Sequence, residues 1–204
     1  MHLALAAMTG GDKRIMDIDK MEMGFRLVLE GLGVELDSPH LKESPRRTAE
    51  AWRDELCGEV GQPAPEFTPY PIEEGFHTGM IALQRIPVKS LCAHHLLPFL
   101  GQATVAFLPD RYYCGLSNLS KVVNHFARRP QLQENLTHDV ARFLEQHLSP
   151  KGVGVLIQAN HTCMEMRDVN HPGLMTTSTL LGEFKTDESL RAEFMTLATS
   201  SGTP

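Results

Sequence analysis

Residues 81–109, IALQRIPVKSLCAHHLLPFLGQATVAFLP, hold two stretches typical of β-strands and, between them, several side chains that can do chemistry. We predict one strand in IALQRIPVKSLCAHH and a second in GQATVAFLP, because Ala103, Val105 and Phe107 fall on one face at a period of two. The segment Cys92-Ala93-His94-His95 closes the first strand. The stretch therefore predicts two strands with a thiol and two imidazoles between them.

The residues that follow predict two helices and then two more strands. In LSNLSKVVNHFARR the apolar stripe is Leu116, Leu119, Val122, Val123 and Phe126, and QLQENLTHDVARFLEQHL carries a second stripe at helical spacing. VGVLIQANHTCMEMRDV and MTTSTLLGEF have strand composition. The order strand, strand, helix, helix, strand, strand indicates an α+β fold rather than alternating β-α-β units.

The N-terminal part is predicted to be helical. Apolar residues recur at helical spacing from Ile18 to Leu32, and a second helix is expected from Ser44, as N-cap, to about Cys57. The Pro- and Gly-rich residues 58–80 read as a long surface connection. We therefore divide the chain into an unstructured segment 1–14, a helical region with its connection 15–80, and a main domain 81–204.

Composition restricts the class of protein. The 204 residues carry a net charge of −6 and are 42% hydrophobic, so we expect no nucleic-acid partner and a well-formed core. No apolar run reaches the length of a membrane span, and the first residues do not resemble a signal peptide. We expect a cytoplasmic protein with reduced cysteines and no membrane partner.

Cys92 and His95 have the spacing of two metal ligands, and a thiolate with an imidazole favours zinc. If 160–168 is one strand, His161, Cys163, Glu165 and Arg167 share a face, and such a face describes a site rather than a core. A C-x-x-H spacing is weak by itself, and a buried cysteine is often only a small apolar residue. From the residues alone, a metal site and two structural cysteines both remain open.

The chain resembles GTP cyclohydrolase I, a family of zinc enzymes. The resemblance covers about residues 15–197 and is carried, in the family's order, by LCAHHLLPFLGQATVAFLP, GLSNLSKVV, RRPQLQENLT, HTCMEMRDV and TSTLLGEFK. It implies a tunnelling fold, an antiparallel sheet with two helices between strand pairs. It also implies assembly through a toroidal β-barrel into a homodecamer with active sites between subunits.

The resemblance also implies the reaction: hydrolysis of GTP at C8 of the guanine, release of formate, and rearrangement to 7,8-dihydroneopterin triphosphate, the first step of folate and pterin synthesis. By the same resemblance Zn²⁺ is bound by Cys92, His95 and Cys163 and activates a water. The other roles it implies are proton transfer by His94 and His161, ribose rearrangement by Ser117, guanine recognition by Gln133 and Glu134, and triphosphate binding by Arg47, Lys121 and Arg167.

Simpler interpretations exist for several of these residues. Gln133 and Glu134 would also suit the solvated first turn of a helix, Ser117 would suit an N-cap, and Arg47 would suit a helix surface.

Four positions depart from the family's usual residues: Ala93 replaces an acidic residue, Asn118 a lysine, Lys121 a common arginine, and Glu50 a residue that is frequently basic. These changes leave two further hypotheses, a paralogue acting on a related guanosine in a specialised pterin or 7-deazapurine pathway, and a non-catalytic zinc-binding ring protein.

Overall fold

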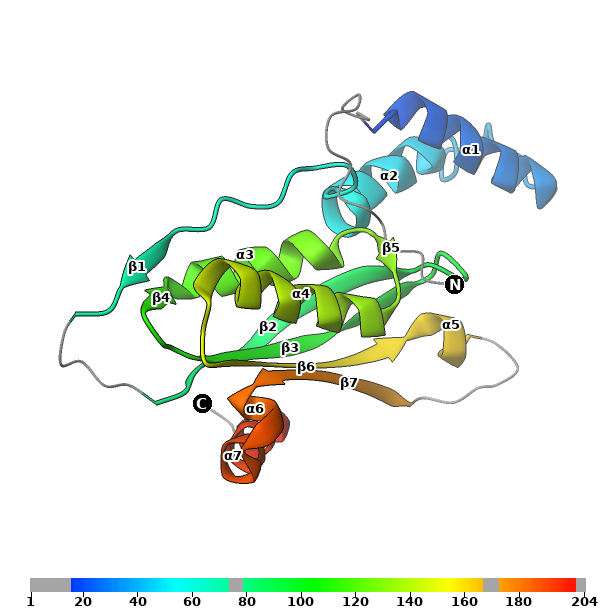
Figure 1. Cartoon of the computed structure of the whole chain (residues 1–204). Coiled ribbons are helices and arrows are strands. Elements are labelled where there is room, and N and C mark those ends of the chain that lie inside the picture. Colours follow the sequence, from blue (N-terminus) through cyan, green and yellow to red (C-terminus); the bar gives the residue numbers. More distant parts are fainter. Residues whose placement is uncertain (1–15, 74–78, 167–172, 201–204) are drawn as a thin grey trace, which may run out of the picture.

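The computed structural model describes residues 16–73, 79–166 and 173–200, and the expectation of an unstructured segment 1–14 lies outside them. Figure 1 shows one mixed sheet with helices on both faces and two further helices at one end. The order of the elements is α1 (Ile18–Gly31), α2 (Ser44–Ala51), the π-helical turn η1 (Trp52–Cys57), β1 (Pro69–Pro71), β2 (Ile81–Cys92), β3 (Pro98–Leu108), β4 (Tyr112–Cys114), α3 (Leu116–Ala127), β5 (Pro130–Gln131), α4 (Gln133–Leu148), β6 (Gly152–His161), α5 (Thr162–Glu165), β7 (Leu174–Gly182), α6 (Glu183–Thr186) and α7 (Glu188–Thr199).

The main sheet has the strand order β5-β2-β3-β6-β7. All neighbouring pairs are antiparallel except β2 and β5, which run parallel through Leu91–Pro130 and Cys92–Gln131. The short strands β1 and β4 form a separate pair. The α+β class predicted from the sequence is confirmed, with α3 and α4 inserted between the two strand pairs.

Both faces of the sheet are covered, and the period of two decides which side chain meets which layer. Ala103, Val105 and Phe107 of β3 are fully buried against α3 and α4, as their spacing predicts. Ala106, between them, belongs to a second cluster with Phe184 and Phe194 of the C-terminal helices. In Figure 1 α6 and α7 lie on the opposite side of the sheet from α3 and α4.

Several predicted boundaries were wrong. Ser44 is the first residue of α2 and Glu43 its N-cap, while Gly115, not Ser117, is the N-cap of α3. The last strand ends at Gly182, whose φ of +57° turns the chain into α6; a side chain there would lie 2.1 Å from the Lys151 carbonyl oxygen.

Several elements were not predicted from the sequence, and one residue predicted on an apolar stripe is exposed. The connection 58–80 contains the short strand β1, and the sequence analysis did not predict α7, whose N-cap Asp187 accepts hydrogen bonds from the Ser189 and Leu190 amides. Leu116, predicted on the apolar stripe, is 54% exposed. Among the described residues, no helix has the length and apolarity needed to span a bilayer.

Candidate active site

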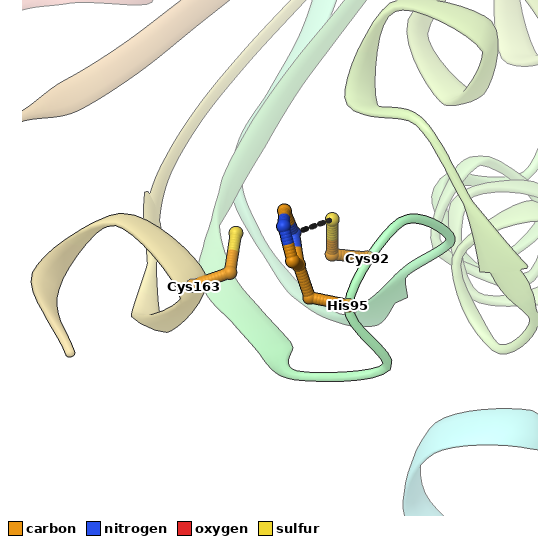
Figure 2. Close-up of side chains that lie close together, drawn as sticks. All are labelled: Cys92, His95 and Cys163. Carbon is orange, nitrogen blue, oxygen red and sulfur yellow. Dashed lines mark hydrogen bonds between the residues drawn. The ribbon is translucent and has the colours of Figure 1, made fainter. Parts of the chain in front are cut away.

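Two cysteines and a histidine meet at the end of the sheet where β2 finishes and β6 passes into α5. One donor atom each from Cys92, His95 and Cys163 lies within 4.8 Å of the other two, and Figure 2 shows the three side chains converging. The Cys92 Sγ and the His95 Nδ1 are 3.9 Å apart. Both cysteines are buried and His95 is exposed, so the cluster opens to the surface on the histidine side.

A tight turn holds His95 beside Cys92. The Leu96 amide donates to the Cys92 carbonyl at 2.8 Å, and the Cys92 amide donates to the Leu97 carbonyl at 2.9 Å. The turn requires a φ of +54° at Leu96, a conformation that costs a residue with a Cβ about 1–2 kcal/mol. Backbone strain of this kind concentrates at functional sites, where the surrounding structure over-determines the conformation.

We expect glycine to be more stabilising than alanine at position 96. Leu96→Gly should exceed Leu96→Ala by about 1 kcal/mol in the free energy of unfolding, because only glycine adopts positive φ without strain. Leu100, equally exposed but in β3, is the matched control, and there glycine should be worse than alanine by roughly 0.5–1 kcal/mol. Urea denaturation of the four variants measures both differences; the same sign at both positions would contradict the explanation.

Cys163 reaches the cluster by a route that the sequence analysis did not predict. The strand proposed for 160–168 is wrong, because β6 ends at His161 and residues 162–165 form the short helix α5. Thr162 marks the change of structure: its Oγ1 donates to the Pro98 carbonyl at 2.7 Å, and its carbonyl accepts from the Met166 amide. The helical turn, not strand alternation, brings the Cys163 thiol toward the β2–β3 turn (Figure 2).

His161, two residues before Cys163, lies in a closely defined environment. Its ring stacks on Phe99, with centroids 4.5 Å apart and an interplanar angle of 10°, and its Nε2 lies 2.9 Å from the Gln133 Oε1. Burial lowers the pKa of His161, and the nearby Glu134 carboxylate opposes that shift. The site therefore favours a neutral imidazole in a fixed orientation.

Gln133 is completely buried, which contradicts the solvated first turn considered for it. Its Nε2 lies 3.0 Å from the Ile157 carbonyl, 3.1 Å from the Met175 carbonyl and 3.0 Å from the Thr177 Oγ1. All polar atoms of this side chain are thus engaged within the chain. Glu134, the next residue, is exposed at the start of α4.

Two threonines of the same network, Thr137 buried and Thr177 half-buried, were not predicted from the sequence. The Thr137 and Thr177 hydroxyls are 2.6 Å apart, and the Thr137 Oγ1 donates to the Gln133 carbonyl at 2.7 Å. A polar residue on the apolar stripe of 133–148 was the available signal, since Thr137 lies one turn after Gln133 and faces the core.

The three converging donors fit a transition metal, and zinc in particular. Tetrahedral Zn²⁺ with bond lengths of about 2.0–2.3 Å needs ligand atoms roughly 3.3–3.8 Å apart, close to the Cys92–His95 separation. Three protein donors leave a fourth position open for a water or substrate. The other two thiols are different: burial raises the pKa of Cys57, and raises that of Cys114 to about 11, so both stay protonated at neutral pH.

The remaining predicted site residues fall into two groups. His94 is exposed and lies edge-on to His95, so it belongs with the cluster. Ser117 and Lys121 are exposed four residues apart on α3, and Arg47 is exposed on α2. Ser117 lies in the first turn of α3, and the other end of this helix leads into β5, which pairs with Cys92. Ten residues of helix separate Ser117 from that end, about 15 Å along the helix axis, so the structure does not bring Ser117 to the cluster. Arg167 lies outside the described residues.

Together these features define an α+β protein with an open site of two cysteines and a histidine suited to a transition metal, near an oriented second histidine. The chain matches the family model described as GTP cyclohydrolase I over residues 21–199. It belongs to the GTP cyclohydrolase I family of enzymes.

Relatives from bacteria show the same similarity along nearly their whole length. The chain is 42% identical over 188 residues to GTP cyclohydrolase 1 of Sulfurihydrogenibium sp. (strain YO3AOP1), covering 91% of this chain and 97% of the relative. It is 45% identical over 184 residues to GTP cyclohydrolase 1 of Aquifex aeolicus (strain VF5), covering 89% and 97%. A crystal structure of the archaeosine synthase QueF-Like in the apo form has a TM-score of 0.45 and 15% identity, covering 52% of this chain and 97% of the other, which is too low to define fold or function.

Proposed function

We propose that this protein hydrolyses the imidazole ring of GTP at C8, releases formate and forms 7,8-dihydroneopterin triphosphate in the cytoplasm, as the first step of folate and pterin synthesis. The observation that carries the proposal is the convergence of Cys92, His95 and Cys163 beside His161, in a chain of this family. Zn²⁺ bound by these three residues would supply Lewis acidity and make a water acidic near neutral pH.

We assign proton transfer to two histidines of the chain. His161 is buried, neutral and oriented by Gln133, which suits it to accept a proton. His94 is exposed at the mouth of the cluster and can exchange protons with solvent. The stack of His161 on Phe99 keeps water from one face of the ring.

We assign guanine recognition chiefly to Glu134. A carboxylate accepts from both N1–H and the exocyclic amine of guanine, and adenine does not offer that pair of donors. Glu134 is exposed and close enough to His161 to influence its pKa. The guanine-reading role predicted for Gln133 stays a prediction, and the engagement of its amide within the chain does not favour it.

We further propose that the active site is completed by neighbouring subunits. The phosphate-binding candidates Lys121 and Arg47, and Ser117 with its role in ribose rearrangement, lie on exposed faces of α3 and α2. One chain cannot bring the start of α3 to its own Cys92. An adjacent copy of the chain can supply the start of its α3 instead. We propose that the copies form a homodecamer built on a toroidal barrel of tunnelling-fold domains (81–204), each preceded by the helical region 15–80. The triphosphate-binding role of Arg167 stays a prediction.

One of the departures noted in the sequence is compensated within the chain. Glu50 accepts from the Arg46 Nε at 3.0 Å, and Arg46 also pairs with Asp19 at 2.6 Å, so the added negative charge faces Arg46 rather than a phosphate. Arg47 remains exposed for a ligand. Asn118 lacks the positive charge of the lysine that it replaces. A paralogue with a less phosphorylated guanosine substrate therefore stays the second candidate.

The substrate is tested by formate release from GTP, GDP and guanosine under anaerobic conditions. We expect GTP to be converted with one formate per pterin, and guanosine to react at least about tenfold more slowly, because each charge-assisted phosphate contact contributes about 1.5–3 kcal/mol. Faster turnover of GDP or guanosine would favour the paralogue. No formate from any of the three, with zinc bound, would indicate a non-catalytic ring protein.

A further inference from the structure

The amide of Gln133 has an orientation that its surroundings determine. Its nitrogen faces two backbone carbonyls, of Ile157 in β6 and Met175 in β7, and carbonyls only accept hydrogen bonds. Exchanging the amide oxygen and nitrogen would place Oε1 against two carbonyls, neither of which has a hydrogen to donate to it. The side-chain oxygen must therefore be the atom that faces His161.

This orientation in turn determines the hydrogen on the His161 ring. The Gln133 Oε1 can only accept, so the His161 Nε2, 2.9 Å away, must donate and carry the hydrogen. In the neutral ring the lone pair is then on Nδ1. Stacking on Phe99 fixes the plane of the ring, and the hydrogen bond to Gln133 fixes its rotation within that plane.

The two threonines extend the same chain of hydrogen bonds. The Thr137 hydroxyl donates to the Gln133 carbonyl, so it accepts from the Thr177 hydroxyl 2.6 Å away. Thr177 is then left to accept from the Gln133 Nε2 at 3.0 Å. Each bond has a single consistent direction, from Thr177 to Thr137 and from Gln133 to Thr177, and the network ties α4 to β7 beneath His161.

We propose that Gln133, supported by Thr177 and Thr137, is a positioning residue that holds His161 as the Nε2–H tautomer and leaves Nδ1 as its proton-accepting atom. The tautomer follows from the hydrogen bonds alone, whereas its effect on the reaction rests on the proposed function. This inference assigns Gln133 a role other than base recognition and gives a function to two threonines that the reaction would otherwise not use. A residue that orients a catalytic histidine changes the rate of the chemical step more than substrate affinity.

The first test compares Gln133→Met with Gln131→Met in the zinc-loaded enzyme. Gln131 is a buried amide two residues away whose side chain donates to the Phe126 carbonyl. We expect Gln133→Met to lower kcat for GTP by about 10–100-fold with KM changed less than about threefold, and Gln131→Met to retain kcat within about threefold. A raised KM with kcat retained would overturn the proposal in favour of guanine recognition.

The second test does not depend on turnover. Solid-state ¹⁵N spectra of histidine-labelled wild-type protein, with His161 assigned by difference from His161→Asn, should show the Nε2–H tautomer at His161. A Nδ1–H ring would overturn the inference even if GTP is the substrate. The spectrum also separates the two failures, because an Nε2–H ring in a protein that releases no formate supports the inference and rejects the proposed function.

The threonines provide a milder variant if Gln133→Met does not fold. Thr177→Val keeps the shape and removes the hydroxyl that bridges Gln133 and Thr137, and we expect kcat to fall about three- to tenfold. Thr177→Ser restores the hydroxyl and should recover most of the rate. Equal rates for Thr177→Val and the wild type would remove the threonines from the proposal.

Discussion

Replacing Cys163 with serine is expected to abolish metal binding and to lower formate release from GTP by on the order of 10³-fold or more. The thiolate of Cys163 is the one donor that comes from the β6–α5 side of the cluster, and a serine hydroxyl does not ionise at neutral pH to replace it. Zinc content by mass spectrometry and formate release together measure the effect.

Cys57→Ser is the matched control for this substitution. Cys57 is equally buried, but it lies in η1 and its thiol stays protonated. We expect this variant to lose some stability and to keep its zinc and its rate per folded chain. Full zinc occupancy in Cys163→Ser would show that the cluster is not the metal site.

Two inactive variants are expected to restore activity to each other when they assemble together. One carries Cys163→Ser, and the other carries Ser117→Ala with Lys121→Glu on the exposed face of α3. If each site combines the metal cluster of one chain with α3 of another, random mixing of equal amounts leaves about a quarter of the sites intact. Co-expression with two affinity tags, tandem purification and fluorescence of the oxidised pterin measure the recovery.

The control for this experiment combines Cys163→Ser with Cys92→Ser. Both substitutions damage the same half of the site, so mixed oligomers should stay inactive. Recovery in the control pair, or no recovery in doubly tagged oligomers of the first pair, would contradict a site shared between subunits.

The convergence of Cys92, His95 and Cys163 was suggested by the sequence, which left a metal site and structural cysteines both open, and the reason given for Cys163 was only partly right. Cys92 and His95 are local, and their spacing alone suggested a ligand pair. The contribution of Cys163 was inferred from strand alternation, whereas the chain leaves the strand at His161 and turns helically. Period-two reasoning fails where a β-strand ends, because the backbone after the last ladder pair is set by tertiary contacts such as the one from Thr162 to Pro98.

The burial of Gln133 could not have been predicted in the same way. Its position at the start of α4 favours solvent, and only the packing of α4 on β6 and β7 places two backbone carbonyls around its amide. The α+β class, by contrast, follows from periodicity that runs over whole elements. Local patterns thus predicted the long strands of the main sheet and the helices α3 and α4 but not β1 or α7, and long-range contacts determined the environment of individual polar side chains.

The distance along the chain between Cys92 and Cys163 has a consequence for the unfolded protein. The two residues are separated by about seventy positions, and the segment between them contains β3, α3, α4 and β6. An ion held by both would close that segment into a loop, and a permanent cross-link of this length reduces the conformational entropy of the unfolded chain by roughly 4 kcal/mol at room temperature. An ion bound at this cluster would therefore stabilise the folded domain. Its loss would shorten the lifetime of the fold as well as stop the proposed reaction.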